Sequence, residues 1–184
     1  MPQVDFNSDD PDSLINSADE VYTSNEFNNL LNNNSEVNLN GIIYVQGNIN
    51  IPRDTVLTIN GALVSEGHIS IGAYWWPFWE PKPSLIINDP GSGPVGLLSM
   101  RKISFESEVD SIDITGLIYA TDKLTFWVYG LNFDLTAGII TRQLIINSLW
   151  QPIVINYDQE LIARTLGSPA TAPIIDVEHW EEEY

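Results

Sequence analysis

The sequence predicts an all-β fold, a short parallel β-solenoid (β-helix) of about five coils with a helical N-terminal cap. Residues 40–51, Asn-Gly-Ile-Ile-Tyr-Val-Gln-Gly-Asn-Ile-Asn-Ile, return almost position for position twenty residues later at 60–71. Within each copy, short runs of alternating apolar and polar residues are typical of β-strands. Because strands this short cannot bury a face alone, the copies are expected to stack and share one continuous core.

Looser copies of the unit continue the repeat through most of the chain. The glycines that lead the five copies are Gly41, Gly61, Gly96, Gly116 and Gly138. Three of the four intervals between them are 20, 20 and 22 residues, and the remaining interval, after Gly61, is 35 residues. A β-sandwich is the rival architecture, since short strands at regular spacing also suit it. The near-identity of two consecutive copies favours the solenoid.

Each unit is predicted to contain three short strands. In the first copy these are Ile42–Val45 after the glycine, Ile49–Ile51 after a corner, and Val56–Ile59, which closes the unit. Alternation places one set of apolar side chains on the inner side of the coil. The residues expected to be buried and stacked between the first two coils are Ile43, Ile49, Ile51, Leu63, Ile69 and Ile71.

The predicted organisation has three segments. They are an acidic leader and helical cap at 1–35, the β-solenoid at 36–158, and a C-terminal cap with an acidic tail at 159–184. Residues 11–22 carry apolar residues at helical spacing after an Asp-rich start, and a second helical patch surrounds Phe27. Together they predict a cap over the first coil, whose strand edge would otherwise stay unpaired. A short helix at 160–164 and a strand at Ile174–Val177 are expected near the end.

The longest interval contains an aromatic insert at 73–83, in which three prolines fence five aromatic residues. Proline removes ladder hydrogen bonds, so a loop between the second and third coils is expected. The candidate ligand-binding residues are Tyr74, Trp75, Trp76, Phe78 and Trp79. Two interpretations stay open: the rings offer flat apolar faces to sugars, or they fold back over the solenoid wall as a second small core. Trp127, Tyr129 and Trp150 would extend such a surface.

Charge and composition limit the classes of partner. The formal net charge is −18, and all seven basic residues lie between Arg53 and Arg164. Since phosphate binding needs clustered Lys and Arg, nucleic acid and anionic membranes are not expected partners, whereas neutral polysaccharide is. The absence of cysteine excludes disulfides and thiolate metal sites. No apolar run predicts a membrane span and no signal peptide opens the chain, so we expect a cytosolic protein or the soluble part of a longer one.

No catalytic residue, metal site or cofactor is predicted. His68 falls at a coil corner where the preceding copy has Asn48, and His179 lies in the acidic tail; neither has a nucleophile signature or a zinc partner nearby. Asp113 and Asp134 alternate with apolar residues on equivalent strands and should form an outward row. That row is more simply the exposed wall of a solenoid than the carboxylate pair that glycosidase chemistry needs.

The opening, the coils and the closing segment together resemble a known family. The chain opens with Pro-Gln-Val-Asp-Phe at 2–6, continues through Leu-Asn-Gly-Ile-Ile-Tyr-Val-Gln-Gly at 39–47, and closes its repeats with Ile-Asn-Tyr-Asp-Gln-Glu-Leu-Ile at 155–162. This arrangement is similar to the C-terminal β-solenoid domain of bacterial type IV pilin-like (pilus-associated) surface proteins. A more distant likeness, in architecture and aromatic content alone, is to the tāpirins, which are solenoid adhesins for cellulose.

The resemblance implies a non-enzymatic role that is extracellular, at the cell surface or on a pilus. It also implies other pilus or cell-surface proteins as partners, and a full-length parent anchored in the membrane through an N-terminal helix. Two features depart from the family pattern: the aromatic insert, and the loss in several coils of the corner glycine found at Gly47 and Gly67.

The expected function is therefore that of a surface module of a pilus-like protein, which acts by display, filament association or adhesion. The alternative is a carbohydrate-binding domain, a polysaccharide adhesin that uses the aromatic insert. A β-helix polysaccharide lyase or hydrolase is the third interpretation, because solenoids also host such enzymes.

Overall fold

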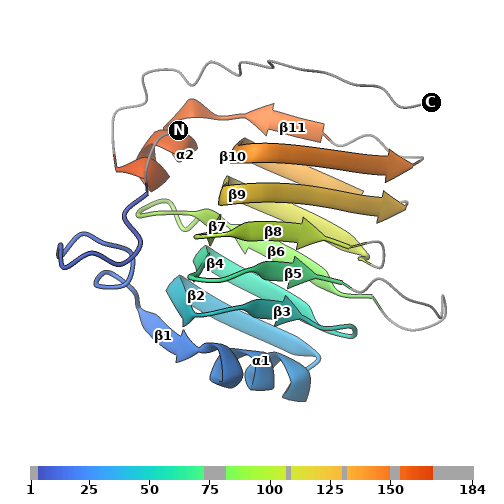
Figure 1. Cartoon of the computed structure of the whole chain (residues 1–184), viewed down its shortest axis with the longest axis horizontal. Coiled ribbons are helices and arrows are strands. Elements are labelled where there is room, and N and C mark those ends of the chain that lie inside the picture. The colour runs from blue at the N-terminus through green and yellow to red at the C-terminus, as the bar shows by residue number, and fades with distance from the viewer. Residues whose placement is uncertain (1–3, 73–81, 107–108, 130–131, 150–153, 168–184) are drawn as a thin grey trace.

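Parallel stacking of short strands builds the molecule (Figure 1). The computed structural model describes residues 4–72, 82–106, 109–129, 132–149 and 154–167. Within these residues eleven strands form a parallel β-solenoid of about six turns, accompanied by two helices. The predicted fold class is confirmed, with one turn more than expected.

Each coil runs along three faces, here called A, B and C. Face A contains the first halves of β2 (Glu36–Gln46) and β4 (Val56–Ser65), then β6 (Ser84–Asn88), the starts of β9 (Ser111–Tyr129) and β10 (Asn132–Leu149), and β11 (Val154–Tyr157). Face B contains β1 (Glu20–Thr23), the second halves of β2 and β4, β7 (Gly96–Ser99), and the middles of β9 and β10. Face C contains β3 (Ile49–Ile51), β5 (Ile69–Ile71), β8 (Lys102–Phe105), and the ends of β9 and β10.

In-register pairing stacks like side chains inside the solenoid. On face C, Ile49 pairs with Ile69 and Ile69 pairs with Ile103, and the column continues through Leu124 and Leu144. All six core positions predicted for the first two coils are buried, which confirms that part of the expected core. Burying a continuous apolar column is the main favourable term for a fold whose single coils have no core of their own.

The corner between faces A and B has no room for a side chain in most coils. Gly41, Gly61 and Gly116 adopt φ angles of +84°, +144° and +147°, which L-amino acids rarely adopt. Ala137 pairs with Gly116 and takes the same conformation, with φ +146°. The coil that contains β10 therefore makes the corner without glycine.

Two of the five leading glycines lie one position beyond this corner, so the predicted alignment of those copies was wrong by one residue. Gly96 pairs with Ala62 and Leu117, and Gly138 also pairs with Leu117, so both lie on face B. The small residue at Gly138 serves a different contact, because an added Cβ would lie 2.7 Å from the Cδ1 atom of Ile162.

Helix α1 (Ser24–Asn33) occupies the place of a face C strand at the N-terminal end of the stack (Figure 1). Thr23 and Glu26 form a capping box that starts the helix. The Asn28 side chain makes the hydrogen bonds to the edge of β3 that a neighbouring strand would make with its backbone. Its Nδ2 donates to the Asn48 carbonyl oxygen at 3.2 Å, and its Oδ1 accepts from the Asn50 amide at 2.9 Å. The helix thus satisfies an edge that would otherwise be open.

Replacing Asn28 with alanine is expected to lower the free energy of unfolding by about 1–3 kcal/mol. The Asn50 amide loses its partner, and the Asn48 carbonyl keeps only the hydrogen bond from the Ser24 hydroxyl. Urea denaturation followed by circular dichroism measures the change. Asn29→Ala is the matched control, since Asn29 lies next to it on the exposed side of the helix. Equal losses in the two variants would show that the amide contact does not stabilise the edge.

The helix expected within 11–22 is absent: residues 11–17 form turns and β1 starts at Glu20. The acidic leader makes local side-chain bonds that compete with a helix, such as Asp12 N–H to Asp10 Oδ1 at 2.9 Å and Ser8 N–H to Asp5 Oδ1 at 3.1 Å. The helical patch around Phe27 was predicted correctly, within α1.

Residues 4–18, here called the leader strap, lie against the outer side of face B. Phe6 and Leu14 are buried, and the Phe6 ring lies 5.8 Å from the Tyr119 ring of β9. Helix α2 (Gln159–Leu166) covers a further part of this side, where the Thr165 hydroxyl accepts from the Val95 amide at 3.1 Å. The middle strands of face B, at 62–65, 96–99 and 117–120, are thereby buried on both sides, whereas β1 stays mostly exposed.

The extra residues of the 35-residue interval are divided between two corners. Residues 72–83 connect β5 to β6, whereas residues 52–55 make the equivalent connection from β3 to β4. A second insertion at 89–94 lies between β6 and β7, at the corner through which β2, β4, β9 and β10 each run as one continuous strand. The first of these insertions contains the predicted aromatic insert at 73–83, whereas the second insertion was not predicted from the sequence.

Candidate functional site

The three corners of the solenoid, A–B, B–C and C–A, carry side chains of different chemistry. Because the coils stack in register, residues far apart in the sequence meet along each corner. Face A and face C present mostly short polar side chains to solvent between these corners, so the corners are where a ligand would find the strongest features.

Aromatic residues gather by topology at the C–A corner, where each coil passes from face C to face A of the next. The aromatic insert joins β5 to β6 there, and Trp127 lies near the end of β9, just before the chain turns into β10. The Trp127 side chain is 39% exposed. An exposed tryptophan on a strand wall presents a flat apolar surface with one hydrogen-bond donor.

Most of the predicted site lies outside the described residues. Residues 73–81 are not among them, so the exposure predicted for Tyr74, Trp75, Trp76, Phe78 and Trp79 stays a prediction. The same holds for Trp150 and for the side chain of Tyr129. Of the aromatic residues that the sequence singled out, the structure places the side chain of Trp127 alone.

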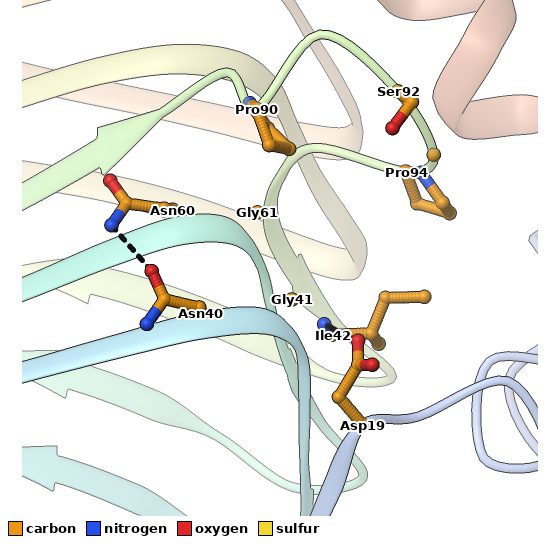
Figure 2. Close-up of a pocket in the computed structure, with 10 residues that line it drawn as sticks. Asp19, Asn40, Gly41, Ile42, Asn60, Gly61, Pro90, Ser92 and Pro94 are labelled. Atoms are coloured by element: carbon orange, nitrogen blue, oxygen red, sulfur yellow. Dashed lines mark hydrogen bonds between the residues drawn. The ribbon is translucent and has the colours of Figure 1, made fainter.

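A pocket of about 310 Å³ lies at the A–B corner (Figure 2). The residues that line it are Asp19, Asn40, Gly41, Ile42, Asn60, Gly61, Pro90, Ser92, Gly93 and Pro94. Its floor is the corner backbone of two coils, and its rim is the 89–94 insertion together with the end of the leader. The sequence analysis did not identify this site, although the Pro-Gly-Ser-Gly-Pro run at 90–94 is a strong loop signal.

A ladder of amides runs along one side of the pocket. Asn60 Nδ2 donates to Asn40 Oδ1 at 2.8 Å, and Asn88 Nδ2 donates to Asn60 Oδ1 at 2.9 Å. Opposite the ladder, the Asp19 carboxylate accepts from the Ile42 amide at 2.8 Å (Figure 2). The pocket therefore offers neutral donors and acceptors with one carboxylate, a set that can hydrogen-bond hydroxyl groups.

The rim loop is tied to helix α2. Arg164 of the helix forms an ion pair with Asp89, at the start of the 89–94 insertion. The Asp89 side chain also accepts from the Gly91 amide at 2.8 Å. These contacts fix one side of the rim, so the pocket is formed by elements that are already held in place.

The titratable residues considered from the sequence occupy solenoid positions. His68 lies at a B–C corner as predicted, with its amide donating to Asn48 Oδ1 at 2.8 Å, and burial together with Lys102 and Arg101 lowers its pKa. Asp113 and Asp134 pair in register on face A and are exposed, which confirms the outward row. His179 lies outside the described residues. No group of three or more His, Asp and Glu side chains within the described ranges could hold a metal ion.

The fold is that of a parallel β-solenoid protein. Comparison with protein-family models, with curated proteins and with solved structures found no match to this chain. Neither of the two described helices has the length and apolar character needed to span a membrane.

Proposed function

We propose that this chain is an extracellular, pilin-like surface module that acts by contact, and that it binds polysaccharide at the C–A corner. The observation that carries the proposal is the position of Trp127, an exposed ring at the same corner from which the aromatic insert leaves and re-enters the stack. Rings on a rigid solenoid lose little conformational freedom when a sugar stacks on them, so they favour binding.

The charge of the molecule also supports a neutral ligand at this corner. A net charge of −18 disfavours anionic partners over most of the surface, while uncharged hydroxyl groups are not repelled. The amide ladder at the A–B corner offers a second place for sugar hydroxyls, on the neighbouring edge of face A.

The cellular setting belongs to the same proposal and rests on the resemblance to pilin-like proteins. The module would be carried by a membrane-anchored parent and would contact other pilus or cell-surface proteins. Exposed apolar side chains in the last turns, Leu144 and Ile146 on β10 and Ile155 on β11, support a role in protein contacts.

Binding to insoluble polysaccharides tests the proposal. The chain is mixed with cellulose, chitin or xylan, and the bound fraction is measured after sedimentation. Trp127→Ala is expected to weaken binding at least about tenfold, equivalent to about 1.4 kcal/mol. A Trp75→Ala/Trp76→Ala/Trp79→Ala variant is expected to do the same if the insert contributes.

Tyr157→Ala is the matched control, because Tyr157 is 51% exposed but lies on β11, at the A–B end of face A. The control should bind as the unchanged protein does. Failure of the unchanged protein to bind any of the three polysaccharides, or equal losses in Trp127→Ala and Tyr157→Ala, would contradict polysaccharide binding at the C–A corner.

A further inference from the structure

The B–C corner carries most of the positive charge of a strongly acidic protein. Four of the seven Lys and Arg residues lie there, on three successive coils: Arg101 just before β8 and Lys102 at its start, Lys123 in β9, and Arg142 in β10. We call these four residues the basic ridge. Three of them are exposed and Lys123 is half-buried.

The stacking of the ridge brings like charges close together. Lys102 and Lys123 are directly paired on neighbouring parallel strands, which lie about 4.8 Å apart. Like charges in this position destabilise a sheet. Among the described residues none of the four ridge side chains forms an ion pair, so this repulsion is not offset by a direct carboxylate contact.

Three acidic residues on the same or neighbouring coils have to be weighed against the positive charge of the ridge. Asp122 lies on the coil between Arg101 and Arg142, and its amide donates to the Arg101 carbonyl oxygen at 2.9 Å. Glu66 accepts a hydrogen bond from the Tyr44 hydroxyl at 3.0 Å. Glu106 lies at the far end of β8, where burial raises its pKa and Lys102 lowers it. Asp122 is thus the one acid within the run of ridge residues.

His68 precedes the ridge on the neighbouring coil. Burial, then Lys102 and Arg101, lower its pKa, whereas Asp122 raises it. Its Nδ1 atom is buried without a hydrogen-bond partner among the described residues. Two basic residues and one acidic residue thus act on His68 from this corner, although the chain as a whole is acidic.

We propose that the basic ridge binds a linear anionic polysaccharide, whose carboxylate or sulfate groups follow the long axis of the solenoid. The ridge is a line of charge that crosses three coils, and its shape suits a slender chain. At physiological ionic strength electrostatic interactions decay over about 8 Å, so a slender chain bound to the ridge is not repelled by acidic residues elsewhere on the surface. A membrane or a DNA duplex is broader and would also come close to those acidic residues.

This inference is independent of the proposed binding of neutral polysaccharide at the C–A corner. The ridge and Trp127 lie at opposite ends of the face C strands, since Lys123 begins that part of β9 and Trp127 is near its end. Loss of one site should leave binding at the other unchanged.

Affinity electrophoresis of the full chain tests the ridge. The gels contain polygalacturonate or dextran sulfate, with neutral dextran and duplex DNA as comparison polymers. The unchanged protein should be retarded by the two acidic polysaccharides, and the retardation should fall as salt is added. Lys102→Ala/Lys123→Ala should weaken binding at least tenfold, and Asp122→Asn should strengthen it.

Arg53→Ala/Lys82→Ala removes the same net charge away from the ridge and should bind as the unchanged protein does. If Lys102→Ala/Lys123→Ala loses its circular dichroism signal, Arg101→Gln/Arg142→Gln tests the same ridge from exposed positions. Equal losses in the ridge and control pairs, weaker binding of Asp122→Asn, binding to DNA as tight as to polygalacturonate, or no retardation at all would each overturn the proposal.

Discussion

Replacing Gly61 with alanine is expected to lower the free energy of unfolding by at least about 3 kcal/mol. Gly61 adopts φ +144° at the A–B corner, and an added Cβ would lie 2.8 Å from the carbonyl carbon of Gly41 on the coil below. Backbone strain of this kind costs roughly 1–3 kcal/mol, and overpacking a buried site costs roughly another 1–3 kcal/mol. Urea denaturation measures the loss.

Gly91→Ala separates the two causes. Gly91 also has positive φ, +87°, but an added Cβ would meet nothing within 4 Å. Its cost should be near 1 kcal/mol, because strain remains and the collision is absent. If Gly61→Ala were as mild as Gly91→Ala, the coils would be farther apart at this corner than the structure has them.

Ile69→Ala should cost about 2–5 kcal/mol through the cavity that it leaves in the core. Ile69 is fully buried and pairs on face C with Ile49 on one side and Ile103 on the other. Its loss removes contacts in both directions along the column, so the cavity cannot close by a small shift of one coil. The midpoint of urea unfolding should fall accordingly.

Ile146→Ala is the matched control, with the same side chain at an inward position of the last turn, where it is 43% exposed. Partial exposure reduces the area lost from the core, so its cost should be well below that of Ile69→Ala. Similar costs for the two variants would contradict the predicted difference between the middle and the end of the stack.

The coil architecture could be predicted because its cause is local and repeated. Ile43 and Ile49 recur as Leu63 and Ile69 after one period, and the in-register stack buries both pairs. The number of turns was harder to predict from the sequence, because β1 and β11 add to the two ends of the stack without a copy of the glycine-led motif. The strand β1 was instead taken as part of a helix, because Leu14 and Val21 fit helical spacing when read without their partners.

The leader shows why spacing alone misled the prediction. Leu14 is buried against the outer side of the solenoid by a strap whose turns are held by Asp5 and Asp10, and Val21 is exposed on a strand. The spacing of apolar residues predicts which side chains are buried but not what they pack against. The leader packs against face B, whose strands lie much later in the sequence.

The corners were the least predictable part of the candidate sites. The insert could be recognised from its tryptophans, but its proximity to Trp127 follows only from the passage from face C to face A. The ridge residues Arg101, Lys123 and Arg142 are separated in sequence by about one coil each and look scattered until the coils are stacked. The net charge predicted that nucleic acid and anionic membranes are not partners, but a net charge averages over a surface that is uneven and does not show a local group of basic residues.

Under a pulling force the leader strap can detach from the solenoid and lengthen the molecule before any coil unfolds. Its Phe6 end lies beside Tyr119, four turns away from β1, where the strap joins the coils. A pull on Val4 therefore peels the strap from face B one side chain at a time before it loads any strand ladder. Residues 4–18 extend to roughly 50 Å at ~3.3–3.6 Å per residue. In the folded state the strap already spans four turns, about 19 Å at ~4.8 Å per turn. A module attached through this end would therefore lengthen by roughly 30 Å at low force while its turns stay folded.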